Sequence, residues 1–214
     1  MIQSASDHYD DIYFQRQNAS EDIRSTVTSH MFRNFIPCGA RILDFGCGGG
    51  GLLRALGGGT GVEINPAAAS HAREKGLEVV SSLKDLPGDA FGAVISNHAL
   101  EHTENPIAEL REMARVCKRG GVIIIVTPCD RPSFGFRHDD PDFHLFSWSA
   151  NNLGNAVKLA GFEILSAKEI KHNFPPRWEF VARRLGFRIF NLLSWARGHL
   201  YPPRSQVRVI GKRL

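Results

Sequence analysis

Two acidic residues stand on either side of a glycine-rich turn and could bind a nucleotide-like cofactor. Asp44 lies in the short apolar run Ile42–Phe45, and Glu63 follows the next apolar run along the chain. Five of the six residues from 46 to 51 are glycine. Glycine lets a ligand approach the backbone closely, and an acid at the end of the second strand can accept hydrogen bonds from ribose hydroxyls. The pattern is typical of the first strand–turn–helix of a nucleotide-binding unit.

The glycine spacing alone leaves several cofactor classes open. Gly46, Gly48 and Gly51 form the pattern G-x-G-x-x-G, which nicotinamide-dependent dehydrogenases also use. A NAD(P)-dependent Rossmann oxidoreductase is therefore one alternative, and a non-catalytic nucleotide- or nucleic-acid-binding module is another. Asp44, placed just ahead of the turn, argues against the dehydrogenase. No aromatic-basic RNA motif favours nucleic acid as a partner.

Several histidines could serve as a general base, because imidazole titrates near neutral pH. His98 follows Asn97 directly after the apolar run 91–96, and His138 and His144 lie in a long charged segment, 128–146. Segments of that length are often functional, and we expect this one to close over the cofactor together with the N-terminal residues. Each histidine could instead cap a helix or form a hydrogen bond in the core.

Four separated motifs, in the same order, resemble the class I S-adenosylmethionine (SAM)-dependent methyltransferases of the small-molecule branch. The motifs are Leu43-Asp44-Phe45-Gly46-Cys47-Gly48, Gly61-Val62-Glu63-Ile64-Asn65, Ser96-Asn97-His98-Ala99-Leu100-Glu101-His102, and His144-Leu145-Phe146-Ser147 with Leu159-Ala160-Gly161-Phe162. The resemblance covers roughly residues 40–170 and implies SAM as the cofactor. The residues that it implies for cofactor binding are Asp44, Gly46, Cys47, Gly48, Glu63, Ile64, Ser82, Leu83 and Asn97. The catalytic candidates, chosen for the chemistry of imidazole, are His98, His144 and His138.

At one position the chain departs from the family pattern. Ser82 stands where the family commonly has an aspartate that accepts a hydrogen bond from the adenine amino group, and a hydroxyl accepts more weakly than a carboxylate. His98, Glu101 and His102 are spaced i, i+3 and i+4, so on a helix they would share a face that also suits a divalent ion. Because the Glu101-His102 pair is widespread in the family in a structural role, we predict no metal.

Apolar strands alternate with amphipathic helices from residue 42 to 170, which predicts a parallel sheet with crossover helices. With the resemblance, this indicates an α/β fold: a Rossmann-like, doubly wound, seven-stranded and mostly parallel sheet whose last strand is antiparallel. An N-terminal helix and a helical insertion before the last strand complete the prediction. The expected strands are 42–45, 60–64, 78–81, 91–96, 122–127, 162–170 and 206–211, and the expected helices begin at Ser20, Leu52, Pro66, Asn105, Ala150 and residue 176. The helix after Asn105 should turn Cys117 inward and stop at Gly120-Gly121, and the first helix should have Met31 on its apolar side.

We expect residues 1–214 to form a single methyltransferase domain. Its parts are an N-terminal helical cap (1–39), the core (40–170), a basic helical insertion (171–205) and the final strand (206–214). The four cysteines have no C-x-x-C spacing, which indicates reduced thiols in a cytoplasmic protein. No apolar run approaches the roughly 20 residues that span a bilayer.

The charge of the chain is unevenly distributed. From Lys171 onward there are ten basic residues and one acid, Glu179, so this part carries +9 and residues 1–170 carry 4 − 9 = −5. The segment 176–198 mixes bulky apolar residues with Arg183, Arg184 and Arg188, which suits an anionic or lipid-linked partner at a membrane surface, or simply a solvated helix that covers the cleft. We therefore expect methyl transfer to an oxygen or nitrogen of a small-molecule acceptor, an anionic or lipid-linked one included, and no nucleic-acid partner.

Overall fold

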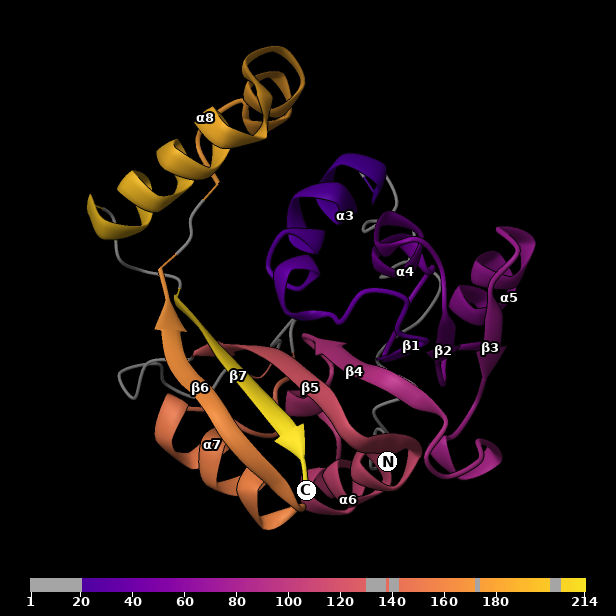
Figure 1. The fold of residues 1–214 in the computed structure, drawn as a ribbon. Coiled ribbons are helices and arrows are strands. Elements are labelled where there is room, and N and C mark those ends of the chain that lie inside the picture. The colour runs from indigo at the N-terminus through magenta and orange to yellow at the C-terminus, as the bar shows by residue number, and fades with distance from the viewer. Residues whose placement is uncertain (1–20, 130–137, 139–142, 172–173, 201–204) are drawn as a thin grey trace.

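The structure is a computed structural model that describes residues 21–129, 138, 143–171, 174–200 and 205–214. One mixed sheet of seven strands forms its centre, in the order β3-β2-β1-β4-β5-β7-β6 (Figure 1). The strands are β1 (Ile42–Phe45), β2 (Thr60–Val62), β3 (Glu78–Val80), β4 (Phe91–Asn97), β5 (Cys117–Cys129), β6 (Phe162–Ile170) and β7 (Ser205–Arg213).

Strands β1 to β5 are parallel to their neighbours, whereas β7 runs antiparallel to both β5 and β6. The carboxyl ends of the parallel strands therefore meet at one edge of the sheet. The pairs Cys129–Ser205 and Ile170–Gln206 place the β6–β7 connection at that same edge. The predicted fold, including its antiparallel last strand, is confirmed.

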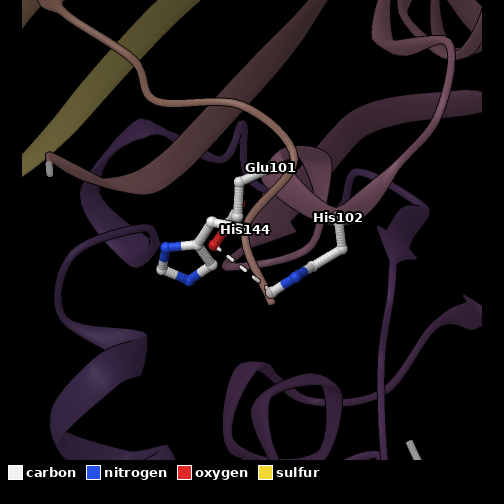
Figure 2. A group of neighbouring side chains, drawn as sticks. All are labelled: Glu101, His102 and His144. Carbon is white, nitrogen blue, oxygen red and sulfur yellow. Dashed lines mark ion pairs between the residues drawn. The ribbon is translucent and has the colours of Figure 1, made fainter. Parts of the chain in front are cut away.

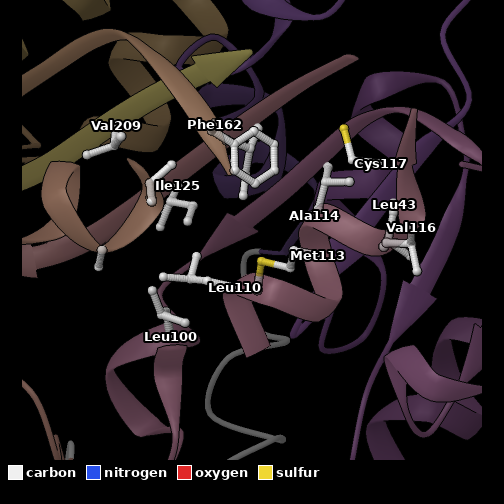
Figure 3. Packing of buried hydrophobic residues seen from close by; sticks show 14 of the residues in the cluster. Leu43, Leu100, Leu110, Met113, Ala114, Val116, Cys117, Ile125, Phe162 and Val209 are labelled. Atoms are coloured by element: carbon white, nitrogen blue, oxygen red, sulfur yellow. The ribbon is translucent and has the colours of Figure 1, made fainter. Parts of the chain in front are cut away.

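Helices cover both faces of the sheet (Figure 1). On one face, α6 (Pro106–Val116) and α7 (Ala150–Leu159) pack Leu110, Met113 and Leu153 against apolar side chains of the strands. Figure 3 shows this cluster, in which Leu43, Ile125 and other strand residues surround the α6 side chains. The other face is covered by α3 (Glu21–Ser29), the 3₁₀ turn η1 (Arg33–Phe35), α4 (Gly51–Leu56) and α5 (Pro66–Glu74). Strand residues alternate between the two clusters, as the pleat requires.

Two helix ends differ from the sequence prediction. The helix that begins after Asn105 was expected to reach Gly120, but it ends at Val116, because Cys117 joins β5 and pairs with Phe91. The first helix was predicted to extend through Met31 on its apolar side. Helix α3 ends at Ser29 instead and tighter turns follow, so Phe32 is fully buried and Met31 is partly buried against the same cluster. The predicted cap Ser20 and most of the segment 128–146 lie outside the described residues.

Helix α8 (Trp178–Leu200) forms the insertion between β6 and β7 and lies at the periphery of the molecule (Figure 1). It is interrupted at Gly186, whose φ of 78° and ψ of 163° are not helical. A buried apolar cluster connects α8 to α3 and contains Val27 of α3 with Val181, Ala182 and Phe190 of α8. The insertion is therefore helical as predicted, in two segments joined at a glycine.

The turn after β1 lies very close to the chain that follows β4. Gly46 has a φ of +74°, and a Cβ atom there would lie 2.3 Å from the Cβ of Ala99. Gly48 also has a positive φ, +52°, but a Cβ there would meet nothing within 4 Å. The first glycine is thus required by packing and conformation, and the second by conformation only.

This difference predicts unequal effects of two alanine substitutions. Gly46→Ala and Gly48→Ala should each cost about 1–2 kcal/mol of unfolding free energy for the left-handed backbone, and Gly46→Ala should cost more because of the clash with Ala99. Adding Ala99→Gly should recover part of the loss in Gly46→Ala and none in Gly48→Ala. Urea unfolding of the four variants measures this; equal losses without rescue would contradict the close approach.

Candidate cofactor and active site

The predicted cofactor residues gather at the carboxyl edge of the sheet. Asp44 lies near the end of β1, Glu63 follows β2, and Asn97 ends β4. Because β1 pairs in parallel with both β2 and β4, these three positions lie on adjacent strands. Open parallel sheets bind their ligands at this edge.

Glu63 is held against the glycine turn. One of its carboxylate oxygens accepts a hydrogen bond from the backbone N–H of Gly48 at 2.8 Å, and the other accepts from the N–H of Asn65, also at 2.8 Å. Asn65 caps α5 by accepting from the N–H groups of Ala67 and Ala68. The carboxylate is therefore positioned between the turn and the start of α5.

Asp44 is a buried carboxyl group with an unused oxygen. Its side chain is 2% exposed, and among the described residues no hydrogen bond reaches Oδ1. Burial raises the pKa of Asp44 well above its ordinary value, and the negative charge of Glu63 raises it further. An orphaned buried carboxyl is costly unless a ligand or water satisfies it. A cationic group of a ligand would satisfy it and would favour its ionised form.

Cys47 fills space beside β2. A Cβ on Gly61 would lie 2.3 Å from its Sγ, so the thiol occupies the room that this glycine leaves. Burial raises the pKa of Cys47 far above that of an ordinary thiol, with the charges of Asp44 and Glu63 adding to the effect. A neutral thiol is a poor nucleophile, which supports a role in packing.

The remaining predicted cofactor contacts are less specific. The Ser82 hydroxyl accepts from the N–H of Lys84 at 3.2 Å and caps the 3₁₀ turn η2 (Leu83–Asp85). Leu83 points into the core and its carbonyl accepts from Arg115, so its side chain is not offered to a ligand. Ile64 is exposed next to Glu63. Contact with adenine by these three residues remains a prediction.

His98 adopts a strained backbone conformation at the end of β4. Its φ is 54°, and its N–H donates to the carbonyl of Val126 on β5. Nδ1 lies 3.8 Å from a carboxylate oxygen of the buried Glu101. Strained residues cluster at functional sites, and this one directly follows Asn97 at the strand end.

His144 joins a second cluster with Glu101 and His102 (Figure 2). One carboxylate oxygen and two imidazole nitrogens lie within 4.8 Å of one another there. This donor set could hold a divalent ion. The N–H groups of Leu145 and Phe146 both donate to the Glu101 carbonyl, so the cluster also fixes this segment to the 3₁₀ turn η3 (Leu100–His102).

The structure corrects one expectation about these histidines. His98, Glu101 and His102 do not share an α-helical face, because η3 starts after His98 and is a 3₁₀ turn. Glu101 nevertheless approaches both imidazoles, at 3.8 Å each. His138 is exposed, and its immediate neighbours lie outside the described residues. Its predicted catalytic role, like that of His144, stays a prediction.

Three further polar residues near the carboxyl edge of the sheet were not predicted. Ser96 and Thr127 are fully buried hydroxyls at the ends of β4 and β5, and no hydrogen bond reaches them from the described residues. Polar residues inside otherwise apolar strand runs were the available signal. Lys75 donates to the carbonyl of Gly49 at 2.9 Å and braces the turn from α5; nothing in the sequence indicated this contact.

The state of Asp44 predicts a pH effect on stability. The folded protein holds the Asp44 proton above the pH at which the unfolded chain releases it, so stability falls as pH rises from about 4 through the raised pKa. The slope can reach about 1.4 kcal/mol per pH unit. Asp44→Asn should flatten this part of the curve, whereas the exposed Asp85→Asn should not. Urea unfolding over a pH series measures it; an unchanged slope in Asp44→Asn would show that the carboxyl is not held protonated.

The chain matches known proteins at the level of a family. A family model described as "Methyltransferase domain" matches residues 15–167. A ubiquinone biosynthesis O-methyltransferase of Xanthomonas axonopodis pv. citri is 37% identical over 105 residues, which are 42% of this chain and 44% of that protein. The protein of the same name from Dinoroseobacter shibae is 31% identical over 128 residues, 54% of this chain and 50% of that one. The chain thus spans half or less of the length of these relatives.

A solved structure agrees with the fold. The crystal structure of a Thermotoga maritima SAM-dependent methyltransferase, described as a possible histamine N-methyltransferase, superposes with a TM-score of 0.70 at 18% identity and covers 98% of this chain and 100% of that one. The family match decides against a nicotinamide-dependent oxidoreductase. The residues of the site also suit SAM, since Asp44 has an unused buried oxygen, Gly48 faces open space and Glu63 lies beside both. The chain belongs to the class I SAM-dependent methyltransferases.

Proposed function

We propose that the chain transfers the methyl group of SAM to a hydroxyl oxygen of a small-molecule acceptor. The observation that carries this proposal is the buried Asp44 carboxyl with its unused oxygen, next to the glycine turn that Glu63 holds. A zwitterionic ligand with an ammonium group and a ribose would satisfy both acids.

The roles of the cofactor residues follow from their chemistry. Asp44 would take the ammonium of the methionine part, and the backbone of Gly46, Cys47 and Gly48 would lie along the methionine and ribose. Glu63 would exchange its bond from the Gly48 N–H for the ribose hydroxyls. Ile64, Ser82, Leu83 and Asn97 would complete the contacts with the adenosine and the methyl-bearing end.

His98 is the proposed general base. Bound SAM supplies a methyl group with a good leaving group, so positioning does much of the remaining work. A hydroxyl acceptor still gains from losing its proton during transfer. Nδ1 of His98 lies 3.8 Å from a carboxylate oxygen of Glu101, which would stabilise the imidazolium that forms when His98 takes that proton. His144 and His138 are the alternative bases.

Oxygen is preferred over nitrogen because the similar curated proteins are named O-methyltransferases. The +9 charge of residues 171–214 supports an acceptor that is anionic or lipid-linked, with peripheral membrane contact through residues 176–198. A phenol with a prenyl chain combines these properties. No feature of the described residues favours a nucleic acid.

The cofactor assignment predicts a large effect of one substitution. Glu63→Ala removes the ribose acceptor and should weaken SAM binding by about 10- to 150-fold, the equivalent of about 1.5–3 kcal/mol for a charged hydrogen bond. Glu74→Ala, an exposed acid on the following helix, should bind SAM normally. Calorimetric titration of the folded variants compares them. Normal affinity in Glu63→Ala would place the cofactor elsewhere.

The acceptor assignment predicts activity on phenols and its loss in a His98 variant. With prenylated phenols the chain should produce S-adenosylhomocysteine, and with matched amines it should not. His98→Asn keeps a residue that tolerates positive φ, and it should lower kcat by about 10²- to 10⁴-fold with unchanged SAM affinity. His71→Asn, on α5, serves as the control. Turnover with amines alone would replace oxygen by nitrogen, and full activity in His98→Asn would transfer the base role to another residue.

A further inference from the structure

The second segment of α8 turns a bulky apolar stripe away from the protein. We call Ile189, Leu192, Leu193, Ala196 and Leu200 the outer stripe; their spacing of i, i+3, i+4, i+7 and i+11 places them on one side of a helix. Ile189, Leu192, Leu193 and Leu200 are 44%, 62%, 39% and 74% exposed. The stripe extends about 16 Å along the helix axis.

The inward side of the same segment has one large apolar residue and two small ones. Phe190, Ser194 and Gly198 are its buried residues, and Phe190 packs in the cluster with α3. A helix that faced only water would show polar residues where the outer stripe lies. An exposed apolar surface of this kind marks an interaction site.

The charged residues of α8 favour one kind of partner. α8 contains Arg183, Arg184, Arg188 and Arg197 and a single acid, Glu179, which gives 4 − 1 = +3. Arg183, Arg184 and Arg188 are exposed. A second copy of α8 would bring only one acid, the half-buried Glu179, to meet four arginines, whereas an anionic lipid surface offers a negative charge to each exposed arginine.

Trp195 has the position of an interfacial anchor. It is 57% exposed, and it lies two helical turns after Arg188 along one border of the outer stripe. Tryptophan favours the boundary between headgroups and acyl chains, where its ring is apolar and its N–H can stay hydrated. This composition, an apolar stripe with a tryptophan at its border and arginines on the same helix, is typical of a helix that lies in a membrane surface.

We propose that α8 docks in the plane of an anionic phospholipid bilayer, with the outer stripe among the acyl chains and Arg183, Arg184 and Arg188 at the phosphates. Within the described part of the chain, no helix has the length and apolarity to cross a bilayer. α8 emerges from the edge of the sheet that carries the candidate site, since Cys129 and Ile170 pair with Ser205 and Gln206 there. This docking rests on the proposed function in one respect, because it specifies the membrane surface as the place where the protein would bind a lipid-linked acceptor. Binding to the bilayer itself requires neither SAM nor the acceptor.

The experiment measures binding of the full chain to sedimenting vesicles without cofactor. The wild type should bind equimolar phosphatidylcholine–phosphatidylglycerol vesicles and bind pure phosphatidylcholine weakly. Ile189→Asp with Leu192→Asp should weaken binding by at least about tenfold. Leu159→Asp with Leu165→Asp changes two exposed leucines of α7 and β6 by the same charge, and it should bind normally. Circular dichroism checks that both double variants are folded.

Two further measurements keep the test independent of that variant. Arg183→Gln, Arg184→Gln and Arg188→Gln should each weaken binding by about fivefold, an effect that salt diminishes. Trp195 fluorescence should shift to the blue on binding, and Trp195→Phe should lose that shift. Failure of methyl transfer would count against the proposed function and leave these readouts unaffected.

Two results would overturn the proposal. One is a folded wild type that does not bind anionic vesicles. The other is a dimer in analytical ultracentrifugation that Ile189→Asp with Leu192→Asp dissociates, without vesicle binding, which would make the outer stripe an interface between copies of the chain.

Discussion

The candidate site depends on how closely the glycine turn after β1 approaches its neighbours. The N–H groups of Gly46 and Cys47 both donate to the carbonyl of Val62, at 2.9 and 3.1 Å, and Gly46 leaves no room for a Cβ beside Ala99. The turn is thereby fixed between the ends of β2 and β4. Only this closeness lets Glu63 reach the Gly48 N–H and sets His98 one residue from the chain segment that Gly46 contacts. A looser turn would separate the acid, the backbone donors and the histidine.

The buried carboxyl group of Asp44 lies close to the half-buried carboxylate of Glu63, and a cationic ligand would stabilise this pair of acids. Burial and the charge of Glu63 both disfavour ionisation of Asp44, whereas a cation bound there would favour it. The unpaired hydroxyls of Ser96 and Thr127 add to the polar groups that the described residues leave unsatisfied at this edge. The two faces of the sheet are apolar and closely packed, and the stability that they provide offsets the unfavourable free energy of the unpaired polar groups at this edge.

The basic insertion is the part of the chain that the family resemblance does not explain. The core contains the candidate cofactor residues, and residues 1–170 have a net negative charge, whereas α8 has a net positive charge and exposed apolar side chains. Both are joined at the carboxyl edge through β5, β6 and β7. In the function that we propose, the carboxyl edge of the sheet would bind the cofactor and the acceptor, and α8 would bind the membrane surface where a lipid-linked acceptor lies.

The local sequence predicted the α/β fold, most strand positions, and the placement of Asp44, Glu63 and the glycine turn at the ends of the first two strands. These features depend on short-range signals, namely the spacing of apolar residues, a run of glycines and an acid at the end of a strand. The local sequence failed where long-range pairing decided the outcome. Cys117, predicted in a helix, pairs with Phe91 as part of β5, and Phe32, which was not predicted in the core, is fully buried next to the partly buried Met31. No local pattern predicted the contact of Lys75 with Gly49 or the cluster of His144 with Glu101 and His102, because these residues are far apart in the sequence. The sequence also did not show that the apolar stripe of α8 would be exposed. Tertiary structure decided these because a side chain's partner depends on how distant elements pack, whereas its propensity depends only on its neighbours in the chain.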